Sequence, residues 1–261
     1  MGALELIGLT LGIAIGFMTV IWIFSLILRN ASIVDIFWGP GFITLACAVF
    51  AVARGSSARS LLMLVLVLAW GVRLALHVGI RNAGRGEDWR YRKWRDEAGP
   101  AFWWRSYFKV FLLQGTILAV VALPLTLGIS AVGPARIGGL GIAGLGVWLL
   151  GFAFETIGDA QLSRFKRDPA NAGKVMDRGL WRYTRHPNYF GESLVWWGIF
   201  LIAAATPLGA WSVFGPVLIT FLLVRVSGVR MLEAGLKERK PEYADYIRRT
   251  SAFIPWPPRR S

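Results

Sequence analysis

The sequence is poor in two kinds of residue, and each scarcity excludes a class of protein. Cysteine occurs once, as Cys47 inside an apolar run, which excludes an internal disulfide and any metal site built from cysteines. Acidic residues number 15 against 29 Lys and Arg, so the formal net charge is +14. In a soluble protein such a balance suggests nucleic-acid binding. No nucleic-acid motif is present, however, and we expect no nucleic-acid partner.

Long apolar runs, by contrast, are abundant. Hydrophobic residues make up 55% of the chain, and runs of roughly 20 residues recur along it. This pattern predicts an all-α, polytopic membrane protein. The first run is too long for the core of a signal peptide, so we expect it to remain as a membrane helix. Seven spans are predicted, over Ala3–Leu28, Ser32–Ala53, Ala58–Ile80, Tyr107–Ile129, Ile137–Gln161, Asn188–Ala205 and Leu208–Met231.

The basic residues predict the orientation of these spans. The loop 81–109, the loop 164–185 and the tail from Arg225 together carry 24 of the 29 Lys and Arg. With seven spans and the N-terminus outside, all three fall on the cytoplasmic side, as the positive-inside rule requires. We therefore expect one transmembrane domain over residues 1–261, in the inner membrane if the source is bacterial, with a substrate side in helices of 1–130 and a cofactor-binding half in 137–261.

The most polar short stretch runs from Arg182 to Glu192 and leads directly into an apolar segment. Pro187 can begin a helix, because its missing N–H falls where helix donors are unpaired anyway. Asn188 and Glu192 then share a helix face, and a carboxylate inside a membrane is costly unless it has a partner or a function. An interfacial basic loop with aromatic residues is the alternative. The polar set comprises Tyr183, Arg185, His186, Asn188, Tyr189 and Glu192.

Asp35 is a second carboxylate in an apolar setting, near the start of the second predicted span. Trp38 lies three residues further on and on the same helix face. A structural role near the membrane interface, or a pair with Arg29, is the alternative to a functional one. Pro40 and Gly41 can loosen the helix and widen a cavity between helices, which favours a functional role for Asp35.

The third predicted span carries Trp70, Arg73 and His77 at spacings of three and four, so they share one stripe. A lone histidine is more often structural, but a stripe of three such residues near the cytoplasmic end favours a site. The loop that follows is amphipathic and can lie on lipid headgroups. Its turn Gly84-Arg85-Gly86 can also present backbone and guanidinium groups to a phosphate.

Glu155 and Asp159 lie four residues apart near the end of the fifth predicted span and share one helix face. Like charges there repel, so they need cations or hydroxyl donors between them. Acceptors for sugar hydroxyls, followed by cations for phosphate, suit a nucleotide; a helix end with ordinary charge pairs is the alternative. The cations that follow are Arg164, Lys166 and Arg167, and we add Arg225, Arg230 and Tyr246 of the C-terminal region to the cofactor-binding candidates.

The stretch from Arg178 to Glu192, with Trp196-Trp197-Gly198 behind it, resembles the C-terminal region of steroid 5-alpha-reductases. The resemblance extends back to Asp159 and forward through Tyr246 to Ile254-Pro255, over roughly the last 110 residues. The first half is similar only loosely and looks like a bacterial branch of that family. The core motif is partly shared with membrane methyltransferases of the isoprenylcysteine type.

The resemblance implies a seven-helix enzyme that binds NADPH from the cytoplasmic side and reduces an enone. It places the family's cofactor residues at Asp159, Asn188 and Glu192, with a basic residue at Lys166 or Arg167 and two third-span residues at Arg73 and His77. The chain departs from the family at three places: Glu155 stands for an Asn, Val34-Asp35 for a Gln-Glu pair, and Trp70 for the Tyr that polarises the ketone. Tyr91 is the candidate replacement for that donor.

The expected reaction is hydride transfer from NADPH to the β-carbon of an α,β-unsaturated ketone, in a steroid-like or other lipid substrate from the bilayer. Charge develops on the carbonyl oxygen, and a donor must be waiting for it in a dry site. Asp35 can donate only if burial keeps it protonated. The catalytic candidates are Asp35, Tyr91 and Glu192, the substrate-binding candidates are Trp38 and Trp70, and Arg73 and Arg85 join the cations for the cofactor phosphates.

Two alternatives of other classes remain at this point. An S-adenosylmethionine-dependent membrane methyltransferase would use a similar Arg-His-Pro-x-Tyr turn, although that class is usually shorter. A membrane scaffold or transporter is the non-enzymatic alternative, but transporters usually show internal repeats, and none is found here. We expect no obligate protein partner.

Overall fold

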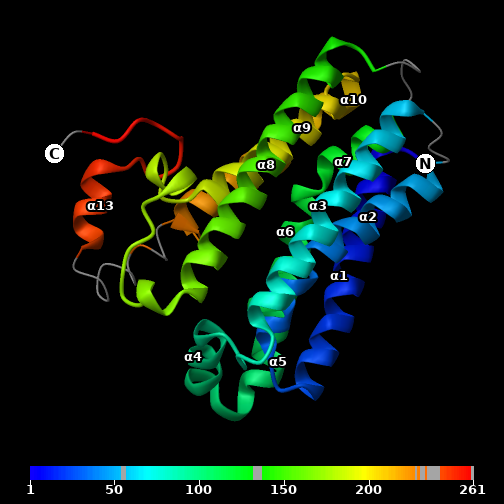
Figure 1. Cartoon of the computed structure of the whole chain (residues 1–261). Helices are drawn as coiled ribbons and strands as arrows, with labels where there is room; N and C mark the ends of the chain where they lie inside the picture. Colours follow the sequence, from blue (N-terminus) through cyan, green and yellow to red (C-terminus); the bar gives the residue numbers. More distant parts are fainter. Residues whose placement is uncertain (54–56, 132–136, 227, 230–232, 234–241, 260–261) are drawn as a thin grey trace. The chain divides into compact units, whose positions relative to one another are not determined.

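The computed structural model describes the chain except for residues 54–56, 132–136, 227, 230–232, 234–241 and 260–261 (Figure 1). The described residues form helices without a strand, and Thr184 and Ser251 make an isolated parallel β-bridge. The prediction of an all-α protein is confirmed. The α-helices are α1 (Ala3–Ile27), α2 (Trp38–Val52), α3 (Ala58–Asn82), α4 (Trp89–Ala98), α5 (Phe102–Ser106), α6 (Leu113–Val121), α7 (Leu123–Ser130), α8 (Gly139–Arg167), α9 (Pro187–Ala203), α10 (Pro207–Ala210), α11 (Phe214–Phe221) and α13 (Tyr243–Arg249).

Tighter and wider helical turns interrupt or join these α-helices. The 3-10 helices are η1 (Ala31–Phe37), η2 (Gly99–Ala101), η4 (Pro169–Asn171), η5 (Gly179–Arg182) and η6 (Trp211–Val213). Two π-helical segments, η3 (Tyr107–Leu112) and η7 (Leu222–Val226), lie within longer helical runs. Because π turns are rare and often occur at functional sites, η3 is considered again below.

Five of the described helical segments are long and apolar enough to cross a membrane: Ala3–Ile27, Ala31–Val52, Ala58–Asn82, Gly139–Arg167 and Pro207–Val226. The segments Trp89–Val121 and Leu123–Ser130 meet at a bend of 42° and make a sixth if they are counted together. The multi-pass prediction is confirmed, but the count of seven is not reached.

The difference in count lies at the sixth predicted span, Asn188–Ala205. It corresponds to α9, which has only 17 residues. At 1.5 Å per residue, such a helix falls short of a hydrocarbon core of about 30 Å. The orientation with the N-terminus outside depends on an odd number of spans, and it stays a prediction.

The chain divides into two compact units, and each is described by itself. The first unit comprises Met1–Gly141 and Ile202–Gly215, and the second comprises Ile142–Leu201 and Pro216–Ser261. In the first unit, α1, α2, α3, α6 and α7 pack together as a bundle, with α4 and α5 beyond one end of it (Figure 1). Apolar side chains on the outside of α3 are exposed, among them Val65, Val72 and Leu76. In a membrane, lipid tails can contact these exposed side chains, so no further protein segment is needed to bury them.

Two glycines set the contact between α2 and α3. A Cβ atom built on Gly39 would lie 2.1 Å from the carbonyl oxygen of Gly71, and one built on Gly71 would lie 2.9 Å from that of Gly39. The two backbones therefore touch, as small residues allow between membrane helices. Trp38 and Trp70 each directly precede one of these glycines, so the contact also fixes the backbone positions of the two tryptophans.

Small residues have the same role between α8 and α9 in the second unit. A Cβ atom on Gly191 would lie 2.4 Å from the amide nitrogen of Glu155, and one on Gly151 would lie 2.6 Å from the carbonyl oxygen of Gly191. Near the start of α9, a Cβ atom on Gly158 would lie 3.2 Å from the amide nitrogen of Asn188. This close approach brings Asn188 beside the stretch of α8 that carries both carboxylates.

Candidate functional site

Asp35 lies in η1 and is bound by two neighbouring residues of α4. Its Oδ2 accepts a hydrogen bond from Arg90 Nη2 at 2.9 Å, and its Oδ1 accepts one from the Tyr91 hydroxyl at 2.7 Å. Tyr91 is only 3% exposed. The structure thus brings together two of the three catalytic candidates, and it pairs Asp35 with Arg90 rather than with Arg29.

Gln114 of α6 extends this network to the predicted substrate-binding residue Trp38. The Gln114 Oε1 accepts a hydrogen bond from Trp38 Nε1 at 2.6 Å, and its Nε2 lies 3.5 Å from the Tyr91 hydroxyl oxygen. We call the connected set Trp38, Gln114, Tyr91, Asp35 and Arg90 the Asp35 network. An indole, an amide, a phenol, a carboxylate and a guanidinium are therefore joined where α4 meets the end of the bundle.

The loop before α4 is hydrogen-bonded to the start of η1, and this contact holds α4 next to Asp35. Glu87 accepts a hydrogen bond from the backbone N–H of Ala31 at 2.7 Å and two from Arg95 at 2.8 and 2.9 Å. Asp88 caps α4 through the N–H of Arg90 at 3.0 Å. Burial acts to raise the pKa of Glu87, but the hydrogen bonds from Arg95 and Ala31 outweigh it, and the pKa lies below its ordinary value.

The predicted stripe on α3 has a buried end and a more open one. Trp70 is fully buried and packs against Phe42, with ring centroids 5.7 Å apart. Arg73 and His77 follow on the same helix and are half-buried. Arg85 is exposed in a turn between Gly84 and Gly86, whose φ angles of 73° and 71° suit glycine. The turn exists as expected, whereas the phosphate contact of Arg85 stays a prediction.

In the second unit, the two carboxylates of α8 are buried. Glu155 is 2% exposed and Asp159 is 7% exposed. Asn188 lies beside them at the start of α9, and its Oδ1 is buried without a hydrogen-bond donor from any residue that the structure describes. A buried acceptor that lacks a partner costs free energy unless a ligand supplies the donor. This geometry is compatible with a ligand that carries hydroxyl or amide donors.

Arg185 and His186 converge on Glu233, a residue that the sequence did not single out. Arg185 Nε lies 2.7 Å from Glu233 Oε1 and Arg185 Nη2 lies 3.2 Å from Oε2, while His186 Nε2 lies 3.1 Å from Oε1. The Arg185 Nη1 donates to the carbonyl oxygens of Ile247, at 3.1 Å, and of Thr250. We call Arg185, His186 and Glu233 the Glu233 clamp, because they tie the polar loop to the C-terminal segment.

Main-chain bonds reinforce the Glu233 clamp. The N–H of Arg185 donates to the carbonyl of Ser251 at 2.9 Å, and the Thr184 hydroxyl donates to that of Phe253 at 2.8 Å. Burial acts to raise the pKa of Glu233, yet the hydrogen bonds from His186 and Arg185 prevail and hold the pKa below its ordinary value. The guanidinium of Arg185 is thus engaged with protein groups on three sides.

The other cofactor candidates occupy varied settings. Arg164, Lys166 and Arg167 are exposed in the last turn of α8, where cations also suit the helix dipole. The ring of Tyr189 stacks on His186 at 5.5 Å, and the Tyr246 hydroxyl donates to the carbonyl of Trp181. Of the rest, Tyr183 and Arg225 are exposed, Glu192 is half-buried on α9, and Arg230 lies outside the described residues.

Sequence reasoning missed Gln114, Glu87 and Glu233, although a signal existed for the first of them. Gln114 is an amide within the predicted span Tyr107–Ile129, and a polar side chain in an apolar span needs a partner or a function, as Asp35 does. Glu87 and Glu233 lie among many other charges, and their partners become known only when distant segments are folded together.

Comparisons with known proteins connect this arrangement to a family. The family described as "Protein of unknown function (DUF1295)" matches residues 21–250. The chain is similar to uncharacterized protein C594.04c of Schizosaccharomyces pombe. The two are 26% identical over an alignment of 279 positions, which covers 95% of this chain and 79% of the yeast protein. No solved structure matches the chain significantly.

Proposed function

We propose that this chain, which belongs to the DUF1295 family, is an NADPH-dependent membrane reductase of the C=C bond of α,β-unsaturated ketones in lipid-like substrates. The family includes proteins similar to steroid 5-alpha-reductases, in agreement with the motifs from Arg178 to Gly198. The observation that carries the proposal is the Asp35 network, which holds the Tyr91 hydroxyl beside a carboxylate and an amide in a buried, apolar setting.

The network supports a division of roles between Tyr91 and Asp35. Both oxygens of Asp35 accept hydrogen bonds, so the group that bears a proton is the phenol of Tyr91. A phenol that turns from Asp35 to a ketone oxygen would stabilise the negative charge that develops there. Asp35 and Gln114 would then keep the Tyr91 ring in position. In this proposal Asp35 is a positioning residue, and the donor that replaces the family's tyrosine is Tyr91.

The second unit offers groups that fit NADPH. The unpartnered Oδ1 of Asn188 and the buried carboxylates of Glu155 and Asp159 are acceptors for ribose hydroxyls or for the carboxamide. Glu192 lies on the same helix as Asn188, and the exposed cations Arg164, Lys166 and Arg167 in the last turn of α8 would bind the phosphates. NADPH, when bound, supplies the hydride. Arg185 and His186 would support this site through the Glu233 clamp rather than by contact with phosphate.

An activity assay tests the proposal directly. The purified chain in lipid nanodiscs is given NADPH and a panel of enones, including a 3-oxo-4-ene steroid and a lipid enone without a steroid ring. We expect loss of NADPH absorbance and a product heavier by two hydrogens with at least one enone, and none with the matching saturated ketone. A thermal stabilisation by S-adenosylmethionine but not by NADPH would contradict the proposal and favour a methyltransferase.

A further inference from the structure

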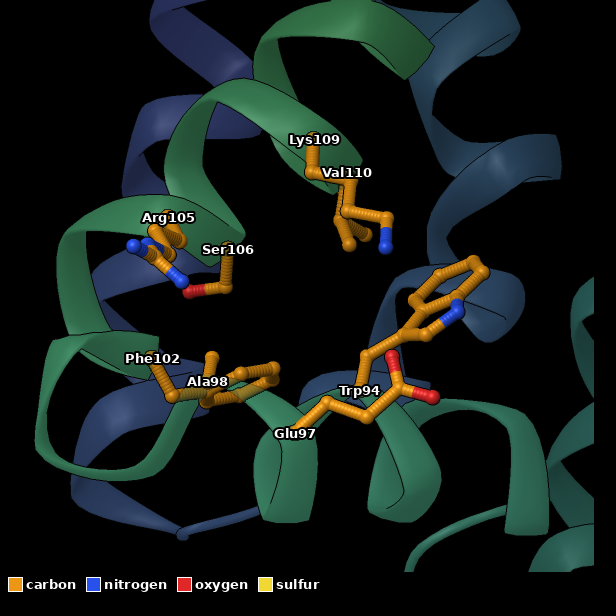
Figure 2. A pocket seen from close by; sticks show the side chains of 8 residues that line it. All are labelled: Trp94, Glu97, Ala98, Phe102, Arg105, Ser106, Lys109 and Val110. Atoms are coloured by element: carbon orange, nitrogen blue, oxygen red, sulfur yellow. The ribbon is translucent and has the colours of Figure 1, made fainter.

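A cavity with charged walls lies at the elbow between α4, α5 and η3, apart from the Asp35 network. Its volume is about 100 Å³, and a single buried water needs only about 10–15 Å³ of such space. A tetrahedral anion therefore fits. Figure 2 shows Arg105 and Ser106 on one side of the hollow and Trp94 and Glu97 across from them. The lining consists of Trp94, Glu97, Ala98, Phe102, Arg105, Ser106, Lys109 and Val110.

The local backbone explains why these side chains converge. Helix α4 ends at Ala98, the next residue Gly99 has a φ of 53° that suits glycine, and the chain turns through η2 into the short helix α5. The π-helical segment η3 follows immediately and carries both Lys109 and Val110 at the cavity. A π turn within a helix frequently occurs at a functional site, and here it brings a cation to the wall opposite α4.

Within the described part of the chain, no carboxylate forms an ion pair with the cations of the cavity. Lys109 Nζ lies 4.5 Å from the centre of the Trp94 ring, and the Arg105 guanidinium lies 5.5 Å from that of Trp104. No carboxylate of the described residues is within ion-pair distance of either cation. Glu97, by contrast, has Lys93 at 3.9 Å. The cavity thus presents two cations toward a ligand and one carboxylate across from them.

The surroundings place this cavity at the surface of a bilayer. It lies at the start of the helical run that leads from η3 into α6, part of the sixth candidate span. Three large aromatic residues beside it are exposed, namely Trp103 at 57%, Trp104 at 43% and Phe108 at 58%. Aromatic residues mixed with Lys and Arg are typical of the interface, where the headgroup phosphates lie.

We propose that this cavity binds the headgroup of an anionic phospholipid that carries free hydroxyl groups, such as phosphatidylglycerol. Arg105 and Lys109 bind the phosphate through charge-assisted hydrogen bonds. The Ser106 hydroxyl already donates to the carbonyl of Trp103 at 2.9 Å and can only accept from the ligand. Glu97 accepts from a headgroup hydroxyl, which a choline headgroup lacks. The acyl chains lie along the apolar surface beside Phe108.

Native mass spectrometry of the full chain in detergent tests this site with phosphatidylglycerol as the probe. We expect the double variant Arg105→Gln/Lys109→Gln to bind phosphatidylglycerol about 30-fold more weakly than the wild type, or about fivefold per charge removed. The variant Arg92→Gln/Arg182→Gln is the matched control, since it removes two exposed cations that do not line the cavity. Wild-type affinity in the first variant would overturn the proposal.

A second variant separates occupation of the cavity from charge alone. Ala98→Leu narrows the hollow and keeps both cations, and we expect it to weaken phosphatidylglycerol binding as well, with unchanged helicity by circular dichroism. Retention of phosphatidylcholine as strong as that of phosphatidylglycerol would overturn the headgroup assignment. Displacement of the lipid by millimolar inorganic phosphate would show a site for free phosphate instead. NADPH oxidation plays no part in these readouts, so the result is independent of the proposed reaction.

Discussion

The Asp35 network and the Glu233 clamp are built from the same parts but differ in what those parts can still do. Each has a carboxylate bound by an arginine and by one further side chain: Tyr91 at Asp35, and His186 at Glu233. In the clamp, the remaining donors of the arginine end on backbone carbonyls. In the network, the second partner is a phenol with a rotatable proton. The first arrangement fixes the chain, and the second can exchange partners with a substrate.

The largest expected effect comes from Glu233→Gln, which tests whether the clamp is structural. Loss of the carboxylate leaves the buried Arg185 charge without its counterion, and we expect the free energy of unfolding to fall by about 3 kcal/mol. Denaturant titration in detergent measures this change. Glu242→Gln, at an exposed position, is the control and should differ from the wild type by less than about 0.5 kcal/mol. An unchanged stability of Glu233→Gln would mean that the clamp does not hold the loop.

Tyr91→Phe tests the opposite expectation for the network. Removal of the hydroxyl should cut kcat for enone reduction about 100-fold and leave the thermal shift with NADPH as in the wild type. Tyr107→Phe is the control, because Tyr107 is a half-buried phenol that also has a hydrogen-bond partner, Thr19 Oγ1 at 3.1 Å. Asp35→Asn should cut kcat less than Tyr91→Phe does. The reverse order would make Asp35 the donor.

Asn188→Ala asks whether an acceptor without a protein partner serves a ligand. We expect the affinity for NADPH to fall about tenfold, while the free energy of unfolding changes by less than about 1 kcal/mol because Oδ1 has no hydrogen bond to any residue that the structure describes. Isothermal titration and unfolding measure the two quantities. Asn171→Ala, which removes a bond to the Phe165 carbonyl at 3.2 Å, should show no loss of NADPH affinity. Equal affinities of all three proteins would remove Asn188 from the cofactor site.

The smallest effect concerns pH and the clamp. Because the folded-state pKa of Glu233 lies below its ordinary value of 4.5, its contribution is complete above that value and disappears as the pH falls through the folded-state pKa. Wild type should therefore lose about 1 kcal/mol more stability than Glu233→Gln between about pH 5 and pH 3. Denaturant titrations across this range give the difference. Parallel curves would show that Glu233 has no stabilising charge interaction.

The apolar runs sufficed to predict where most membrane helices lie. Ala3–Leu28 became α1 and Ala58–Ile80 became α3 with few changes at the ends. Hydropathy does not predict the type of helix or where it is interrupted. The second span begins as the 3-10 helix η1, and Tyr107–Ile129 is divided by η3 and by the bend before α7. These interruptions depend on neighbours such as Pro124 and on packing, which a hydropathy pattern does not contain.

The polar residues show a sharper limit. The sequence identified Asp35 as a candidate because a carboxylate in an apolar run needs a partner, and the resemblance to steroid 5-alpha-reductases suggested Tyr91 as the replacement donor. Their direct hydrogen bond joins segments 56 residues apart, which only the folded chain reveals. Arg185 was predicted from the basic character of its loop, and its charge alone did not distinguish a ligand contact from a bond to Glu233. The roles in substrate and cofactor binding stay predictions.

The touching backbones at Gly39 and Gly71 limit how this molecule can open. Any side chain at either position would collide with the opposite main chain, so α2 and α3 behave as one rigid wall. A lipid-like substrate that entered the first unit between helices would therefore have to pass between a pair other than α2 and α3. Both positions should also accept no larger residue in a saturation mutagenesis library.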